Sequence, residues 1–104
     1  MNPQRIAQLQ ALMVIDKTDP FLPYAVAQEY MSGEKWAEAA EIFAQVNIDF
    51  PEYLPAYYHY SLALVQLGNL NSAIQVLQSG MQLARQQKDF KTAAEIEALL
   101  EDLE

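Results

Sequence analysis

Cysteine is absent from this chain of 104 residues, and its three glycines, Gly33, Gly68 and Gly80, are isolated from one another. Without cysteine the chain has no thiol nucleophile, no disulfide and no cysteine-ligated zinc. Because no two glycines are close in sequence, a glycine-rich loop that cradles phosphate is also excluded. Several classes of enzyme and metalloprotein are therefore removed at the outset.

Basic residues are few as well: six Lys and Arg stand against fourteen Asp and Glu, which gives a formal charge of −8. Nucleic-acid binding needs clustered positive charge, so we expect no nucleic-acid partner. The apolar stretch Ala11–Ile15, which follows Arg5, has five residues. It is too short for a signal-peptide core or a membrane span. We expect a cytoplasmic protein with no membrane partner.

Side chains that carry catalysis are equally scarce. His59 is the only histidine, so a two-histidine metal site is impossible, and Ser61 lies on a different helical face. Paired carboxylates can act as acid and base when burial splits their pKa values. Glu34, Glu38 and Glu41 instead have the spacing of a solvated helix face. We expect no catalytic residue, no cofactor and no metal, and therefore no enzyme.

An internal repeat is the strongest signal that the sequence does contain. When residues 23–51 are written above residues 57–85, a shift of 34, small residues meet small ones and bulky apolar residues meet bulky apolar ones. The matched pairs include Val26 with Tyr60, Ala27 with Ser61, Tyr30 with Leu64, Ala39 with Ala73 and Phe43 with Leu77. Two copies of one structural unit are therefore predicted.

The repeat resembles the tetratricopeptide family, whose 34-residue pattern is W-x2-L-G-x2-Y, then A-x3-F, then P. The second copy reads Tyr57-x2-Tyr60-Ser61-x2-Leu64, and the first ends at Pro51 in the closing proline slot. Pro23 in the tryptophan slot, Gly33 one place early and Arg85 in place of the closing proline depart from the pattern. The resemblance implies an all-α fold, a right-handed superhelix of antiparallel helical hairpins.

Local signals place the helices of one domain over residues 1–104. Asp19-Pro20 predicts a helix start, Gly33 and Gly68-Asn69 predict turns, and Asp89 predicts the cap of the last helix. The apolar spacing predicts six helices, at about 3–15, 20–32, 36–48, 54–67, 71–86 and 90–103. Repeat 1 covers about 20–53 and repeat 2 about 54–87, and the first and last helices cap the stack.

The resemblance also implies a concave groove, lined by the first helix of each hairpin, that binds a protein or peptide. The repeat register places Tyr24, Gln28, Met31, Ser32, Tyr58, His59, Leu62, Val65 and Gln66 there. We expect Tyr24, Gln28, Tyr58 and His59 to be exposed in it; alternatively, the flanking helices cover part of this face. No Lys, Arg or Asn occurs in the set, so the partner is not an acidic carboxylate tail.

The second repeat has one further peculiarity: Leu54–Ala84 contains no Asp, Glu, Lys or Arg. Three explanations are open. Neutral polar residues such as Gln66, Asn69, Asn71, Gln75, Gln78 and Gln82 solvate its outer face. Alternatively, neighbouring helices cover the hairpin, or it forms an interface in a homodimer, because interface cores are depleted of charge.

Two functions follow from these patterns. The first is a protein-interaction module or small adaptor that binds a peptide or protein segment in the concave groove. The second is a self-associating structural or accessory subunit of a larger assembly, without a free groove. The sequence does not identify the partner, because a fold does not fix its ligand.

Overall fold

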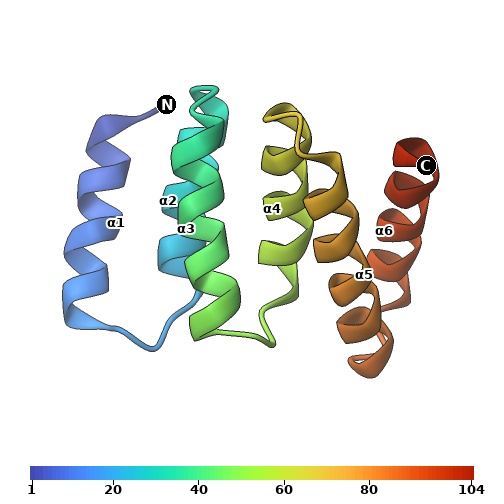
Figure 1. Cartoon of the computed structure of the whole chain (residues 1–104). Coiled ribbons are helices and arrows are strands. Elements are labelled where there is room, and N and C mark those ends of the chain that lie inside the picture. Colours follow the sequence, from blue (N-terminus) through green and yellow to red (C-terminus); the bar gives the residue numbers. More distant parts are fainter.

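The computed structural model describes residues 1–104, which form six α-helices and no strand. The helices are α1 (Pro3–Ile15), α2 (Phe21–Ser32), α3 (Trp36–Asp49), α4 (Leu54–Gln66), α5 (Leu70–Gln86) and α6 (Phe90–Leu103). Each helix packs mainly against its neighbours in the chain, and α2 also touches α4. Figure 1 shows them in sequence order, each antiparallel to the next. The expected all-helical stack of hairpins is confirmed.

Side-chain caps fix the starts of three helices. The backbone N–H of Phe21 donates to Oδ1 of Asp19 over 3.0 Å, and that of Thr92 donates to Oδ1 of Asp89 over 3.1 Å. Each bond satisfies one of the amide groups that a helix start leaves without a partner. Both caps were predicted. Asn2 caps α1 in the same way, since its Oδ1 accepts from the backbone N–H of Arg5; this cap was not predicted from the sequence.

The turns inside the two hairpins share one backbone conformation at equivalent positions. Glu34 has φ 59° and Gly68, 34 residues later, has φ 77°. In both turns an amide reaches back to the preceding helix over 2.9 Å, from Lys35 to the Tyr30 carbonyl and from Asn69 to that of Leu64. Gly33 was expected to permit the first turn, but its φ is −92°. Glu34 takes the left-handed conformation instead, because the register requires it there.

Matching positions of the two repeats are buried in the core. Ala27 and its equivalent Ser61 are both 0% exposed, and so are Phe43 and Leu77. A small side chain where helices cross lets their backbones approach, and a bulky one fills the space beside the crossing. The hydroxyl of Ser61 is satisfied by the Tyr58 carbonyl of its own helix. The internal repeat of the sequence is therefore a repeat of core packing.

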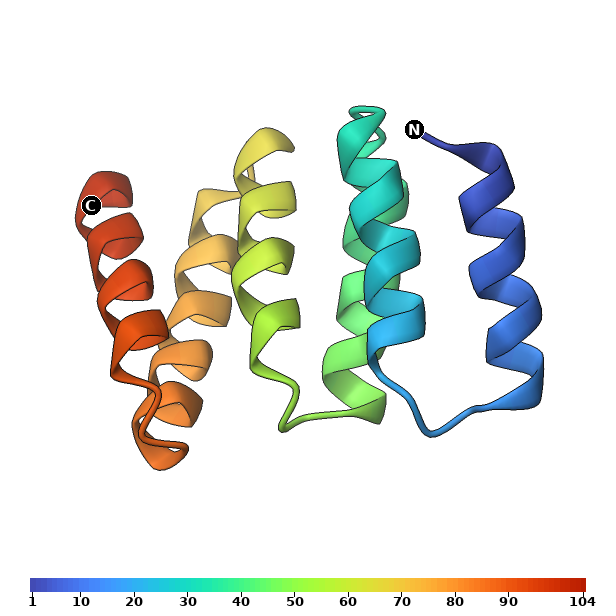
Figure 2. The same cartoon turned by 180° about the vertical axis from the view of Figure 1, so that it is seen from behind.

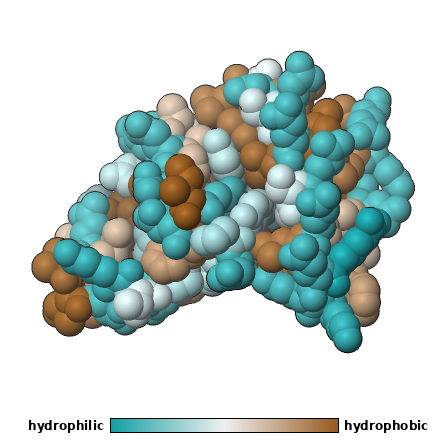
Figure 3. Space-filling model, turned by 60° about the horizontal axis from the view of Figure 1, so that its bottom comes forward, coloured by the Kyte–Doolittle hydropathy of each residue, from teal (hydrophilic) through white to brown (hydrophobic).

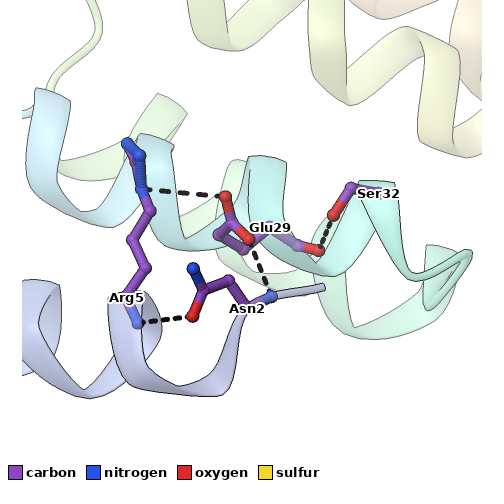
Figure 4. A network of polar contacts seen from close by, with 4 residues as sticks. All are labelled: Asn2, Arg5, Glu29 and Ser32. Atoms are coloured by element: carbon purple, nitrogen blue, oxygen red, sulfur yellow. Dashed lines mark hydrogen bonds and ion pairs between the residues drawn. The ribbon is translucent and has the colours of Figure 1, made fainter.

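Helix α1 is attached to α2 by two kinds of contact. Ile6 and Leu9 are its only buried residues, and they pack against Leu22, Ala25 and Val26. Figure 4 shows the polar contact near the N-terminus of α1, where the backbone N–H of Asn2 donates to Oε1 of Glu29 over 2.9 Å. Nε of Arg5 lies 3.7 Å from Oε2 of the same carboxylate. The N-terminal half of α1 is thus held on α2.

The uncharged second hairpin combines two of the three explanations. Helix α3 packs on α4 and α6 packs on α5, so neighbours cover part of it. Its remaining exposed surface carries the neutral polar residues Gln66, Asn69, Asn71, Gln75, Gln78 and Gln82. Leu67 and Leu70 at the tip of the hairpin are 46% and 44% exposed. Self-association through this hairpin stays a prediction.

Candidate functional site

Three helices share one side of the molecule. Figure 2 shows α2, α4 and α6 facing the viewer, with α3 and α5 behind them. In the space-filling view of Figure 3 the lower edge of the molecule is indented between the end that carries α1 and the end that carries α6. These three helices therefore provide the surface on which the predicted groove residues are to be placed.

A hydrogen-bonded chain of side chains joins the first two of these helices. The Tyr24 hydroxyl on α2 lies 3.1 Å from Nδ1 of His59 on α4. Nε2 of Gln28 donates to the same hydroxyl over 2.9 Å. Nδ1 of His59 is also 3.1 Å from the Pro55 carbonyl oxygen. Since a carbonyl can only accept, a proton on Nδ1 satisfies Pro55, whereas an unprotonated Nδ1 accepts from Tyr24.

Aromatic rings surround this chain. The Tyr24 ring meets the Tyr53 and His59 rings nearly edge-on, at centroid distances of 5.3 Å and 5.4 Å. The Tyr24 ring also lies 5.9 Å from the Phe43 ring, and the Tyr58 ring lies 5.6 Å from that of His59. Tilted and edge-to-face pairs such as these add to the stabilisation from burial. His59 and Tyr58 are thereby presented from a rigid aromatic cluster.

A pocket of about 350 Å³ opens between the N-terminal ends of α4 and α6. Tyr58 and His59 line it from α4, and Thr92 and Glu95 line it from α6. Glu52 and Asp89 bring the other two carboxylates, and no Lys or Arg is among the lining residues. At one edge Nε2 of Gln87 donates to the Glu52 carbonyl over 2.7 Å, which ties the two rims together. The pocket has an aromatic wall and a negatively charged rim.

Ionisation of the site follows from burial and hydrogen bonding. Desolvation raises the pKa of the Tyr24 and Tyr53 phenols above their ordinary value of 10.0, so both are neutral at physiological pH. The Thr92 backbone and hydroxyl donate to the Asp89 carboxylate and lower its pKa below 3.8. Asp89 is therefore charged, and the pocket attracts positive rather than negative groups.

Most of the predicted groove residues are at least partly exposed on α2 and α4. Tyr58, His59 and Gln28 are half-buried and lie together around the pocket and the hydrogen-bonded chain. Farther along the same helices, Leu62 is half-buried and Gln66 is exposed. Met31 is half-buried and packs against the core of the first repeat.

Two of the predicted residues do not present free side chains to a groove. Tyr24 is only 7% exposed, contrary to the expectation of an exposed residue, because its ring is enclosed by Phe43, Tyr53 and His59. Its hydroxyl contacts Nδ1 of His59. The Ser32 hydroxyl donates to the Glu29 carbonyl over 2.7 Å, beside the contact between α1 and α2 (Figure 4).

The contribution of α6 was missed. From the sequence this helix was expected to be a cap, whereas Thr92 and Glu95 form one wall of the pocket. A signal was present: the shift of 34 that relates the two hairpins carries α4, Leu54–Gln66, onto residues 88–100. Most of that range lies in α6, Phe90–Leu103. By register, α6 is the first helix of a third unit, which places it on the same face as α2 and α4.

No group of three or more His, Asp and Glu side chains is placed to hold a metal ion. None of the six helices combines the length and the apolar character that a membrane crossing requires.

Comparison with known proteins agrees with the repeat architecture. The sequence model described as "Tetratricopeptide repeat" matches residues 30–96. No curated protein matches the chain. A tetratricopeptide repeat domain protein from Salinibacter ruber, solved by NMR in solution, is 28% identical. The alignment covers 86% of this chain and 90% of that one, with a TM-score of 0.80.

Two further structures are similar in fold. The Yersinia enterocolitica type III secretion chaperone SycD, solved with a peptide of the translocator YopD, is 19% identical with a TM-score of 0.85. That alignment covers 94% of this chain and 76% of that one. PcrH from Pseudomonas aeruginosa is 22% identical with a TM-score of 0.87, over 94% and 75% of the two chains. Because the family match spans more than half of its residues, this chain belongs to the tetratricopeptide repeat family.

Proposed function

We propose that the chain is a protein-interaction module that binds a segment of a partner protein along α2, α4 and α6. The observation that carries this proposal is the pocket of about 350 Å³ between α4 and α6, with Tyr58 and His59 in its wall. Rigid aromatic side chains in a pocket bind a partner at low entropic cost and dominate many interfaces. The partner segment would place an apolar side chain against them.

Chaperones of the same fold support a peptide as the partner. SycD has been solved with a peptide of YopD, and PcrH with the chaperone-binding region of PopD. This chain shares their fold at 19% and 22% identity, so the likeness does not extend to those particular partners. A small adaptor that holds an unstructured segment of another protein is the corresponding role. The cytoplasm as its location stays a prediction.

The negative charge of the pocket limits the class of partner segment that can bind. Glu52, Asp89 and Glu95 surround the pocket, and no basic residue lines it. An acidic tail would be repelled and would find no cationic donors for its carboxylates. The partner is therefore a neutral or basic segment, and a peptide in this groove binds with micromolar affinity, about 8 kcal/mol.

Selection from a random peptide library on the immobilised chain tests the proposal. The selected peptide is titrated by calorimetry into wild type, Tyr58→Ala and Gln75→Ala, whose thermal unfolding is recorded in parallel. Gln75 is exposed on α5, outside the groove, and serves as the matched control. We expect a loss of about tenfold in affinity for Tyr58→Ala alone, near 1.4 kcal/mol. Equal affinities for all three proteins would exclude the groove.

A further inference from the structure

A second and larger cavity, of about 900 Å³, is lined by residues of α1, α2 and α3 and of the loop between α1 and α2. We call it the α1–α3 cleft. Met13 lines it from α1, and Asp16, Lys17 and Asp19 line it from the loop between α1 and α2. Most of the remaining wall comes from α3, through Glu41, Ile42, Gln45, Val46 and Asp49. It shares no lining residue with the pocket between α4 and α6. Nothing in the proposed peptide groove uses it.

Helix α1 is attached to α2 mainly through its N-terminal half, and Met13 is only partly buried against the same apolar cluster. Ile6 and Leu9 pack on α2, and Glu29 binds the N-terminal end of α1, as Figure 4 shows. Beyond Leu9 no residue of α1 is buried, and α1 and α3 make no substantial contact. In Figure 1 both helices run in the same direction, with α2 set between and behind them. A channel between two parallel helices is left unfilled.

The floor of this channel is apolar. Met13 from α1 and Ile42 from α3 face it, together with Phe50 and Pro23. All four are partly exposed, although apolar side chains at a helix contact are normally covered. Such a groove between helices is the type of surface on which an amphipathic helix lays its apolar face. Its volume lies within the range of about 300–1,000 Å³ that is typical of binding sites.

The charged residues at the rim of the cleft indicate a positively charged occupant. Four carboxylates line the cleft against one cation, Lys17. Asp16 and Asp19 are fixed by hydrogen bonds from Thr18 and from the Phe21 amide. The pKa of Asp16 is lowered by the Thr18 bonds, so this carboxylate is ionised. The cleft is thus apolar at its floor and negatively charged at its edges.

The remaining two carboxylates, Glu41 and Asp49, lie on the outer side of α3. They form no ion pair within the chain, where Arg5 with Glu29 is the only pair. Gln45, between them, donates to Asp49 over 2.9 Å and leaves the negative charge in place. Both residues are exposed, so they are free to meet cations from a partner.

We propose that the α1–α3 cleft is a second docking site, whose occupant is a basic amphipathic helix of a partner protein. The apolar face of that helix contacts Met13, Ile42 and Phe50, and its flanking Lys or Arg side chains pair with Glu41 and Asp49. The chain then holds two segments at once, one in the groove and one in the cleft. Two sites that share no lining residue suit an adaptor that joins two proteins or two segments of one.

The probe for this proposal is a synthetic amphipathic helix of leucine and lysine, titrated into the ¹⁵N-labelled full chain and followed by NMR. A leucine–glutamate peptide with the same apolar pattern is the comparison. We expect saturable shifts at the amides of Met13, Ile42 and Asp49 with the lysine peptide, and none with the glutamate peptide. Shifts confined to Tyr58 and His59, or no saturation with either peptide, would overturn the proposal.

Charge-reversal variants distinguish binding in the cleft from general attraction by the overall charge of −8. Glu41→Lys/Asp49→Lys changes two exposed cleft residues, and Glu97→Lys/Glu101→Lys changes two exposed residues of α6 by the same amount. We expect the first pair to weaken binding of the lysine peptide about tenfold more than the second. Equal losses would mean that only the net charge acts, and the cleft would be rejected. Binding of the library-selected groove peptide is measured on the same variants, which keeps the two sites distinguishable.

Discussion

The hydroxyl of Tyr24 and the imidazole of His59 meet at 3.1 Å, although the two residues belong to the first helices of different repeats. This contact joins α2 to α4 directly beneath the face on which a partner is proposed to bind. The Tyr24 ring is buried, and only its hydroxyl reaches the polar chain that continues to Gln28. The groove floor is therefore part of the core of the stack, and its geometry depends on how the two repeats pack.

Replacement of Tyr24 by Phe tests this coupling. The ring packing is retained, but the bonds to His59 and Gln28 are lost, so we expect a loss of about 1 kcal/mol in the free energy of unfolding. Urea denaturation measures it. Tyr58→Phe is the control, because no hydrogen bond involves the Tyr58 hydroxyl, and it is expected to behave like wild type. A Tyr24→Phe variant as stable as wild type would show that the polar chain contributes nothing.

In the two hairpin turns, removing and adding a glycine are expected to change stability in opposite directions. Glu34 has φ 59°, a conformation that costs a residue with a Cβ about 1 kcal/mol or more, so Glu34→Gly stabilises the chain by about that amount. Gly68, at φ 77°, has open space around it, and Gly68→Ala destabilises through backbone strain alone, again by about 1 kcal/mol. Thermal unfolding measures both. Shifts of the same sign would contradict the equivalence of the turns.

Gly80 fits its position because there is little space for a side chain, and not because of its backbone angle. A Cβ at this position would lie 3.1 Å from Cβ of Tyr57 and 3.4 Å from Cδ1 of Ile96. Tyr57 cannot easily retreat, because its hydroxyl donates to the Pro51 carbonyl over 2.7 Å. Overpacking of a core contact costs about 1–3 kcal/mol, which exceeds the gain of about 1 kcal/mol in helix propensity.

We therefore expect Gly80→Ala to lower the unfolding free energy by about 1 kcal/mol. Ser79→Ala, one residue earlier and exposed, is the control, and its better helix propensity is expected to raise stability by a few tenths of a kcal/mol. Chemical denaturation of both variants measures the difference. If Gly80→Ala is the more stable protein, α4 and α5 are less closely packed than the structure has them.

Alkaline pH is expected to destabilise the fold through its buried tyrosines. Desolvation raises the pKa of Tyr24, Tyr53 and Tyr57 above 10.0. The unfolded chain then loses these protons first, so their contribution to stability is complete below pH 10 and declines as pH rises through the folded pKa. Unfolding free energies between pH 8 and 12 measure the decline, and Tyr24→Phe should flatten it. An unchanged slope in that variant would place the titrating group elsewhere.

Local features of the sequence predicted local features of the fold. The caps at Asp19 and Asp89 and the small-residue slots at Ala27 and Ser61 depend on neighbours within a helix or on the repeat period, both of which are visible in the chain. The burial of Tyr24 was not predictable in this way. It results from rings that three other elements supply, at Phe43, Tyr53 and His59.

The two cavities could not be predicted from the sequence, for a related reason. The pocket between α4 and α6 depends on α6 acting as a further first helix, which its apolar spacing alone does not reveal. The cleft depends on the lack of substantial contact between α1 and α3, and a missing contact leaves no periodic pattern. From the sequence, Glu41 was expected on a solvated helix face and Asp49 was given no role, because the position of the neighbouring helix is not visible in the chain.

The central claim is that α2, α4 and α6 form the binding face, and NMR of the ¹⁵N-labelled chain with the library-selected peptide tests it most directly. The account predicts saturable shifts that are largest at Gln28, Tyr58, His59 and Glu95. Shifts concentrated at Gln75, Gln78 and Gln82 on the exposed side of α5, with the groove amides unchanged, would contradict it.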